Sequence, residues 1–174
     1  PGDAILVSGD LGSHGVAVFS VREGLTFAGN VKSDSAPLHD IVANLIESGI
    51  DIHCLRDLTR GGLASVLNEL AAAAKVGMTV DEMVIPVNES VRGACELLGL
   101  DPLYVANEGR FVAMVPAPQA DAALAVMRRH KAASLATHIG VVTDRDPPMV
   151  VLRTVVGTHR VLDLLSGEQL PRIC

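Results

Sequence analysis

The sequence predicts an α/β (α+β) domain in which a mixed β-sheet is covered by helices. Short apolar runs of strand length alternate with amphipathic helical patterns along the chain, and glycine or proline separates most of them. Apolar residues make up 49% of the 174 residues and aromatic residues only 2%, so aliphatic side chains must fill the core. This length is ample for one domain with a sizeable core.

The predicted elements follow one another with short turns between them. A strand at 4–7 leads through a glycine-rich turn to a helix that ends near Glu23, with Gly24 as its stop. A polar loop at 26–36 precedes the clearest helix, at 37–48, with Pro37 in its first turn. The later elements are a strand at 50–55, a helix after Gly62 whose face includes Leu63, Leu70 and Ala74, a strand at 76–80, a helix at 88–98 capped by Asn88, strands at 103–106 and 111–115, a helix at 119–130, and strands at 138–143, 149–154 and 158–162.

Two predictions concern turns and ends. Residues 107–110 are expected to close a hairpin between the strands at 103–106 and 111–115, because Glu-Gly makes a tight reversal easy. Residues 1–162 are expected to form the domain, and the polar, proline-broken residues 163–174 a mobile tail. The chain opens at Pro1 and runs straight into a strand, so we expect this end to be a cut within a longer protein.

Composition excludes several classes of function. The net charge of −6 argues against a general nucleic-acid binder. No apolar run approaches the roughly 20 residues that cross a bilayer, so no membrane span is expected. Cys54, Cys95 and Cys174 have no paired spacing, which favours a reducing, cytoplasmic compartment over a disulfide framework. No set of residues at metal-ligand spacing predicts a metal site, and Cys95 is expected to be a core residue.

Residues 56–62 carry unusual chemistry for a turn between a strand and a helix. Arginine forks match phosphate or carboxylate oxygens, glycines allow close approach, and a helix start favours anions. The alternative is a helix capped by Asp57 or Thr59, with an Arg–Asp pair on the surface. The glycine-rich turn at 8–15 also suits an anion, although a tight turn is the favoured interpretation there. The candidate substrate- or phosphate-binding residues of this stretch are Arg56, Asp57, Thr59, Arg60, Gly61 and Gly62.

Two single residues have open interpretations. Glu108 is either a solvated turn residue, which composition alone favours, or an acid presented at a strand end. Cys174 is either an ordinary exposed thiol or a reactive group on a mobile tether. The neighbouring terminal carboxylate disfavours the thiolate of Cys174, and Arg172 offsets part of that effect.

Four stretches together resemble one family: residues 1–15, residues 55–63, Ala106-Asn107-Glu108-Gly109, and the terminal Pro171-Arg172-Ile173-Cys174. The chain resembles the C-terminal half of the HypE family of hydrogenase expression/formation (maturation) proteins, within the AIR-synthase-related (PurM-like) superfamily. Residues 59–62 match the superfamily as a whole, whereas the terminal cysteine is specific to the HypE family. Leu58 stands where the family pattern has proline.

The resemblance implies a PurM-like C-terminal-domain fold and a role in nickel–iron hydrogenase maturation. A HypF-like carbamoyltransferase would load a carbamoyl group onto Cys174, and ATP would drive its dehydration to a thiocyanate that donates the cyanide ligand to the active-site iron. Glu108 would be the catalytic base, and Asn107 would join the candidate binding residues. An N-terminal domain outside this sequence would bind most of the ATP and Mg²⁺.

The resemblance also implies a HypC–HypD-like iron scaffold complex as a partner, a homodimer when full length, and little activity of this domain alone. Two other classes of function stay open. One is a selenophosphate-synthetase-like or thiamine-phosphate-kinase-like ATP enzyme, in which Cys174 is incidental. The other is a non-catalytic interaction module whose tail docks into a partner.

Overall fold

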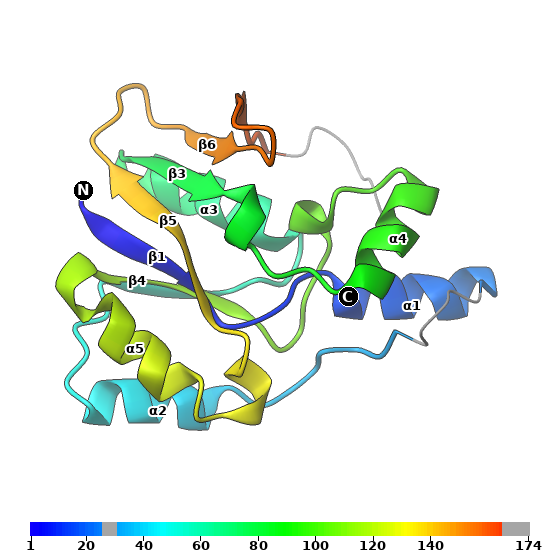
Figure 1. Ribbon diagram of the computed structural model, residues 1–174, viewed down its shortest axis with the longest axis horizontal. Helices are drawn as coiled ribbons and strands as arrows, with labels where there is room; N and C mark the ends of the chain where they lie inside the picture. The colour runs from blue at the N-terminus through cyan, green and yellow to red at the C-terminus, as the bar shows by residue number, and fades with distance from the viewer. Residues whose placement is uncertain (26–30, 165–174) are drawn as a thin grey trace.

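The computed structural model describes residues 1–25 and 31–164. Within them, seven strands form one sheet in the order β2-β4-β1-β5-β3-β6-β7 (Figure 1). Strands β3 and β6 pair in parallel and every other pair is antiparallel, so the predicted mixed sheet is confirmed. The strands are β1 (Asp3–Val7), β2 (Cys54–Asp57), β3 (Gly77–Asp81), β4 (Phe111–Pro116), β5 (Thr137–Thr143), β6 (Val150–Arg153) and β7 (His159–Val161).

Helices cover both faces of this sheet. Helices α2 and α5 lie side by side on one face, α3 covers the other, and α1 and α4 stand together at one end (Figure 1). The α-helices are α1 (Ser13–Glu23), α2 (His39–Glu47), α3 (Gly62–Ala74), α4 (Glu89–Leu98) and α5 (Ala120–Met127), and short 3₁₀ turns occur at η1 (Glu82–Val84), η2 (Pro102–Tyr104), η3 (Ala117–Gln119) and η4 (Lys131–Ala133).

Strand β1 lies in the middle of the sheet and is buried on both sides. Ala4 and Leu6 belong to the core under α2 and α5, whereas Ile5 and Val7 belong to the core under α3. Successive side chains of a strand point to opposite faces, so a strand covered on both faces needs apolar residues at every position. This explains why the first strand of the sequence is a continuous apolar run.

A third, smaller core joins α1 to α4. It contains Val16, Val91, Ala94, Cys95 and Val105. The predicted helix ends are confirmed here: Gly24 follows α1 with a φ of 63°, and the Asn88 side chain accepts from the Ser90 amide at 3.0 Å. Burial raises the pKa of the Cys95 thiol to about 11, which agrees with its predicted core role.

The predicted hairpin between strands at 103–106 and 111–115 is wrong, because only the second strand forms, as β4. Residues 102–104 form the turn η2, and β4 pairs with β1 and β2. The Asp101 side chain accepts from the Leu103 amide at 3.0 Å and Pro102 begins the turn, which favours a 3₁₀ conformation. The apolar side chain of Leu103 is buried in the core under α3, and that of Val105 in the core that joins α1 to α4.

Several predicted boundaries also shift. The strand expected at 50–55 is β2, because Ile50 and Ile52 pack into the core under α2 and α5 before the ladder begins. The helix expected at 37–48 begins at His39, so Pro37 precedes it, and the helix expected at 119–130 is the shorter α5. In α3, Ala71 is buried and Ala74 is exposed. Among the described helices, none is long and apolar enough to span a membrane.

Candidate functional site

Two motifs that are far apart in the sequence meet at one end of the sheet. Asp57, the last residue of β2, pairs with Phe111, the first residue of β4. Just beyond this pair, the Leu58 amide donates to the Arg110 carbonyl and the Asn107 amide donates to the Leu58 carbonyl, both at 3.0 Å. The stretch 56–62 and the Asn107-Glu108-Gly109 turn are therefore neighbours in space, although they are far apart in the sequence.

Further segments join the same place, which we call the polar junction; it comprises residues 8–15, 33–36, 57–62 and 103–110. Ser8 follows β1, and its amide donates to the Phe111 carbonyl at 3.0 Å. Its buried hydroxyl accepts from the Phe111 amide at 2.9 Å. The polar junction thus extends the sheet beyond the ends of β1 and β2 through loops.

Asn107 is the centre of the polar junction. Its side chain is completely buried. Its Oδ1 accepts from the Gly12 amide at 2.8 Å, and its Nδ2 donates to the carbonyls of Leu58 at 3.0 Å and Val105 at 3.1 Å. The amide therefore ties three segments together by bonds within the chain. A ligand-binding role for Asn107 stays a prediction.

Backbone amides at the start of α1 are hydrogen-bonded to other residues of the chain. The amide of Gly12, whose φ is 86°, bonds Asn107, and the amide of Gly15 bonds the Ala106 carbonyl at 3.0 Å. The His14 amide donates to Asp34 Oδ2 at 3.4 Å. These partners satisfy amide groups that a helix start otherwise leaves open, which supports the tight-turn interpretation of residues 8–15.

Asp34 also holds the turn that carries Glu108. Its Oδ1 accepts from the Glu108 amide at 2.7 Å and from the Gly109 amide at 3.1 Å. A Cβ on Gly109 would lie 2.0 Å from the Asp34 carbonyl oxygen, so a glycine is required at this close approach. Asp34 lies in the predicted polar loop and was not a candidate residue. Its signal in the sequence, an aspartate in a small polar loop, is common to many ordinary turns.

Arg110 fixes the other side of the turn. Its guanidinium donates to the Gly109 carbonyl at 2.8 Å and pairs with Asp10 at 2.6 Å. The two side chains of this ion pair are only 11% and 17% exposed. A largely buried pair of this kind makes the geometry of the turn costly to change.

A polar cleft of about 330 Å³ opens beside this turn. Two acidic residues, Asp10 and Asp34, and the basic residue Arg110 are part of its lining. The residues that line it are Asp10, Ser13, Val31, Lys32, Ser33, Asp34, Asn88, Ser90, Val91 and Arg110. Charges of both signs and hydroxyl groups therefore surround a hollow next to the backbone that presents Glu108, whose side chain is half-buried.

The stretch 56–62 is built differently from its capped-helix alternative. The residue that precedes α3 is Gly61, with a φ of 72° and no side-chain cap, so capping by Asp57 or Thr59 is wrong. Arg56 pairs with Glu69 of α3 at 2.7 Å rather than with Asp57, and both partners are about half exposed. Thr59 is half-buried, and Asp57 and Arg60 are exposed.

Two residues of this stretch have structural reasons for their identity. Gly62 has a φ of 58°, and a Cβ on it would lie 2.6 Å from the carbonyl oxygens of both Leu103 and Val105. Leu58 is completely buried, and its amide makes the bond to Arg110 that a proline would lack. Roles of residues 56–62 in phosphate binding stay predictions.

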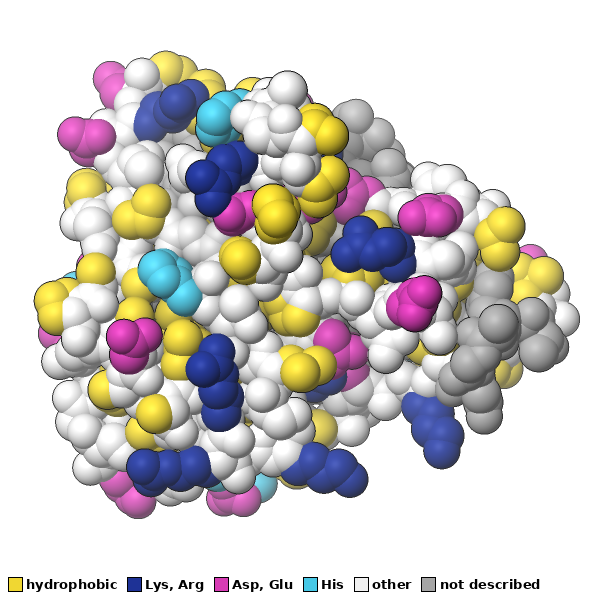
Figure 2. Space-filling view, viewed as in Figure 1, with side chains coloured by type: hydrophobic (Ala, Val, Ile, Leu, Met, Phe, Trp, Pro, Cys, Tyr) yellow, Lys and Arg dark blue, Asp and Glu magenta, His cyan; other side chains and the backbone are white. Residues whose placement is uncertain are grey.

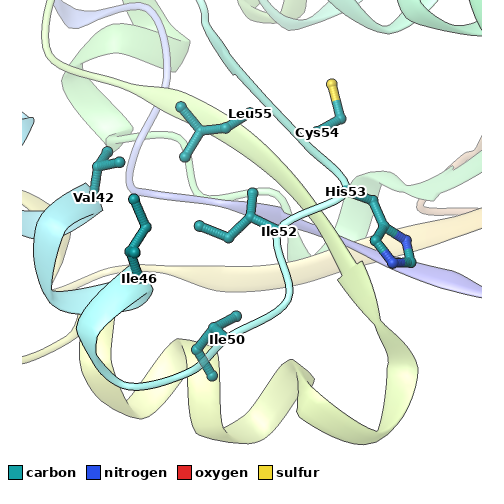
Figure 3. Close-up of a pocket in the computed structure, with 7 residues that line it drawn as sticks. All are labelled: Val42, Ile46, Ile50, Ile52, His53, Cys54 and Leu55. Atoms are coloured by element: carbon teal, nitrogen blue, oxygen red, sulfur yellow. The ribbon is translucent and has the colours of Figure 1, made fainter.

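A second hollow is apolar and lies near the start of β2 (Figure 3). This apolar groove has a volume of about 430 Å³ and is lined by Val42, Ile46, Ile50, Ile52, His53, Cys54 and Leu55. His53 bridges Asp3 at 2.7 Å and Asp51 at 3.3 Å, and mainly its hydrogen bond to Asp3 raises its pKa. Burial raises the pKa of Cys54. The apolar groove contains no candidate site residue, so the polar junction is the better candidate site.

Three further predictions concern Cys174, a metal site and the charge of the surface. Cys174 and residues 165–174 lie outside the described residues. Residues 1–25 and 31–164 contain no group of three or more His, Cys, Asp or Glu that could hold a metal. On the face shown in Figure 2, basic side chains are interspersed with acidic and apolar ones and form no continuous basic surface.

The mixed sheet and the helices that cover it have the fold of AIR-synthase-related proteins. The chain belongs to the family described as AIR synthase related protein, C-terminal domain, which matches residues 1–152. The predicted resemblance to this superfamily and to HypE is confirmed.

The most informative relatives are all HypE proteins. The chain is 55% identical to carbamoyl dehydratase HypE of Cupriavidus necator over all 174 residues, which is 50% of that protein. It is 49% identical to hydrogenase maturation protein HypE crystallised in complex with ATP, with a TM-score of 0.95 over 100% of this chain and 53% of that one. It is 43% identical to a chain of the crystal structure of a HypE–HypF complex, with a TM-score of 0.90 over 95% of this chain and 53% of that one. The chain therefore spans about half the length of the curated relatives it matches.

Proposed function

We propose that the full-length protein matures nickel–iron hydrogenase as an ATP-dependent carbamoyl dehydratase. The observation that carries this proposal is the 55% identity to a carbamoyl dehydratase HypE, in an alignment that covers the whole chain. In this proposal Cys174 receives a carbamoyl group and holds it while ATP drives its dehydration. The product, a thiocyanate on Cys174, donates the cyanide ligand to the active-site iron.

The chemistry defines what the chain must provide. Converting S–CO–NH₂ to S–C≡N removes the carbonyl oxygen and both protons of the nitrogen. Transfer of the terminal phosphoryl group of ATP to that oxygen makes it a leaving group, so the products are ADP, inorganic phosphate and the thiocyanate. One proton of the nitrogen is accepted by a base, a role that we assign to Glu108, and the other leaves with the departing phosphate. The support for Glu108 is the turn that carries this half-buried residue, whose backbone is held by Asp34 and Arg110, two residues that line the polar cleft.

We assign the ATP and Mg²⁺ sites mainly to the N-terminal half, which lies outside this sequence. The described residues contain no group of three or more His, Cys, Asp or Glu side chains that could hold a metal ion. The contribution of this chain to phosphate binding would come from the end of β2 and the loop that follows it, with Arg56 and Arg60 as the cations. The other candidate binding residues are Asp57, Thr59, Gly61, Gly62 and Asn107. Because the Arg56–Glu69 pair is exposed, exchanging its partner costs little.

The proposal includes partners. A structure of a HypE–HypF complex supports a HypF-like carbamoyltransferase as the donor of the carbamoyl group. A HypC–HypD-like iron scaffold complex would accept the cyanide, and the full-length protein would be a cytoplasmic homodimer. The scaffold complex and the homodimer follow from the family resemblance alone, and the compartment from the spacing of the cysteines.

The first test is the intact mass of the full-length protein after incubation with its carbamoyltransferase, carbamoyl phosphate and ATP. We expect Cys174 to gain one carbamoyl group and then to lose one water in the presence of ATP. Cys174→Ala should show neither change, whereas Cys54→Ala, the same substitution in the apolar groove, should show both.

Other outcomes identify the alternatives. Undiminished ATP turnover by the full-length Cys174→Ala variant, with no modified cysteine in the wild type, would favour another ATP enzyme of the superfamily. Partner binding that persists in Cys174→Ser, again with no modified cysteine, would favour an interaction module. ATP turnover by the isolated 174-residue chain would contradict the assignment of the ATP site to the N-terminal half.

A further inference from the structure

Asp34 is the group that ties the Glu108 backbone to another part of the fold. One carboxylate oxygen, Oδ1, accepts from both the Glu108 amide at 2.7 Å and the Gly109 amide at 3.1 Å. The other oxygen accepts from the His14 amide at the start of α1, at 3.4 Å. Hydrogen bonds to an ionised carboxylate are shorter and stronger than neutral ones. This one side chain therefore bonds both the turn and the start of α1, in addition to the bond between Asn107 and the Gly12 amide.

The surroundings of this contact leave the turn little freedom. The Asp34 carbonyl oxygen lies so close to Gly109 that an added Cβ would be 2.0 Å away. On the opposite side, Arg110 donates to the Gly109 carbonyl at 2.8 Å. The residue before Glu108 is the buried Asn107, which is bonded to Gly12, Leu58 and Val105. Asp34 supplies the bond to the amide of Glu108 itself.

We propose that Asp34 is a positioning residue for Glu108, whose backbone it holds through the Glu108 and Gly109 amides. This inference rests on the proposed function, in which Glu108 is the base. Asp34 acts through Glu108 and takes no proton from the substrate. Displacement of a catalytic group by 1 Å costs about 100-fold in rate, so losing this anchor should slow the dehydration step in particular.

The test uses the full-length protein with Cys174 already carbamoylated, and follows by intact mass the loss of water after ATP is added. Asp34→Ala should lower this single-turnover rate by about 10- to 100-fold. Loading of Cys174 by the carbamoyltransferase, which does not require Glu108, should stay within about twofold of wild type, since only interactions with the reacting group change. Asp40→Ala, whose side chain is exposed on α2, is the matched control and should react at the wild-type rate.

A double variant separates positioning from a general structural role. If Asp34 acts only through Glu108, then Asp34→Ala combined with Glu108→Gln should be no slower than Glu108→Gln alone. Losses that multiply in the double variant would overturn the inference. If Asp34→Ala does not fold, Asp34→Asn takes its place, because its amide oxygen can still accept from the Glu108 amide without the charge. We expect Asp34→Asn to be about threefold to tenfold slower than wild type.

The failure of this inference differs from the failure of the proposed function. Wild-type dehydration together with wild-type rates for every folded Asp34 variant would overturn only the role of Asp34. If the loaded wild-type protein loses no water with ATP, both the proposed function and the inference are overturned.

Discussion

The polar junction and the apolar groove lie near the two ends of the same short edge strand, β2, and they are built on opposite rules. The polar junction follows the strand, and its cleft of about 330 Å³ is lined mostly by polar side chains. The apolar groove lies near the start of the strand, and its hollow of about 430 Å³ is lined mostly by aliphatic side chains (Figure 3). They are similar in size, so their difference is one of chemistry.

The comparison shows where the identity of a residue matters. In the polar junction, Asn107, Asp34 and Arg110 each bond several defined atoms. Among the described residues, no buried side-chain nitrogen or oxygen lacks a partner. Losing one partner of a buried polar group leaves the other unsatisfied, whereas aliphatic contacts have no direction. Single substitutions should therefore cost far more in the polar junction than in the apolar groove.

The largest expected effect comes from Asn107→Asp. This change replaces the Nδ2 donor with an oxygen that faces the carbonyls of Leu58 and Val105, in a completely buried position. We expect the free energy of unfolding of the 174-residue chain, measured in urea, to fall by about 4 kcal/mol. The matched control is Asn88→Asp, because Asn88 is an exposed helix cap that uses only its oxygen, and it should change stability by less than about 0.5 kcal/mol. Equal effects of the two substitutions would contradict the comparison.

A glycine pair gives the next largest effect. Gly62→Ala would place a Cβ 2.6 Å from two backbone carbonyl oxygens at a φ of 58°, and we expect it to destabilise the chain by about 3 kcal/mol. Gly93→Ala in α4 adds a Cβ with nothing within 4 Å, and should stabilise the chain by about 0.5 to 1 kcal/mol. Denaturation in urea measures both values. A neutral Gly62→Ala would show that α3 can move away from η2 at little cost.

The smallest effect is expected at the apolar groove and should depend on pH. Asp3 and Asp51 raise the folded-state pKa of His53, so the folded protein binds this proton more tightly than the unfolded chain does. The resulting stability is fully present below about pH 6.5, the ordinary histidine pKa, and is lost as pH rises through the raised value.

Thermal unfolding measures this contribution. His53→Gln should lower the melting temperature at pH 5.5 and leave it nearly unchanged at pH 8.5. His159→Gln, the same substitution on the exposed strand β7, is the control for a general effect of removing a histidine. A His53→Gln effect that is equal at both pH values would remove the charged pair as its cause.

Local patterns in the sequence correctly predicted much of the fold. The continuous apolar run of β1, the helices α2, α3 and α5, the Asn88 cap and the glycine after α1 are all confirmed, although Ala74 of the predicted α3 face is exposed. Each of these features depends on residues within a few positions of one another, so the chain need not be folded for the pattern to be visible. Motifs alone also brought Glu108 and residues 56–62 to attention.

Only the tertiary structure decided how these pieces meet. The order of the strands, the 3₁₀ turn in place of a predicted strand at 103–106, and the contact of Gly62 with Leu103 and Val105 all depend on residues far apart in the sequence. The same holds for Asp34, which is 74 positions from the Glu108 amide it bonds. The local sequence determines which residues can form a helix, a strand or a turn. The partner of a buried polar group depends on how the whole chain packs, because that packing decides which donors and acceptors lose access to water.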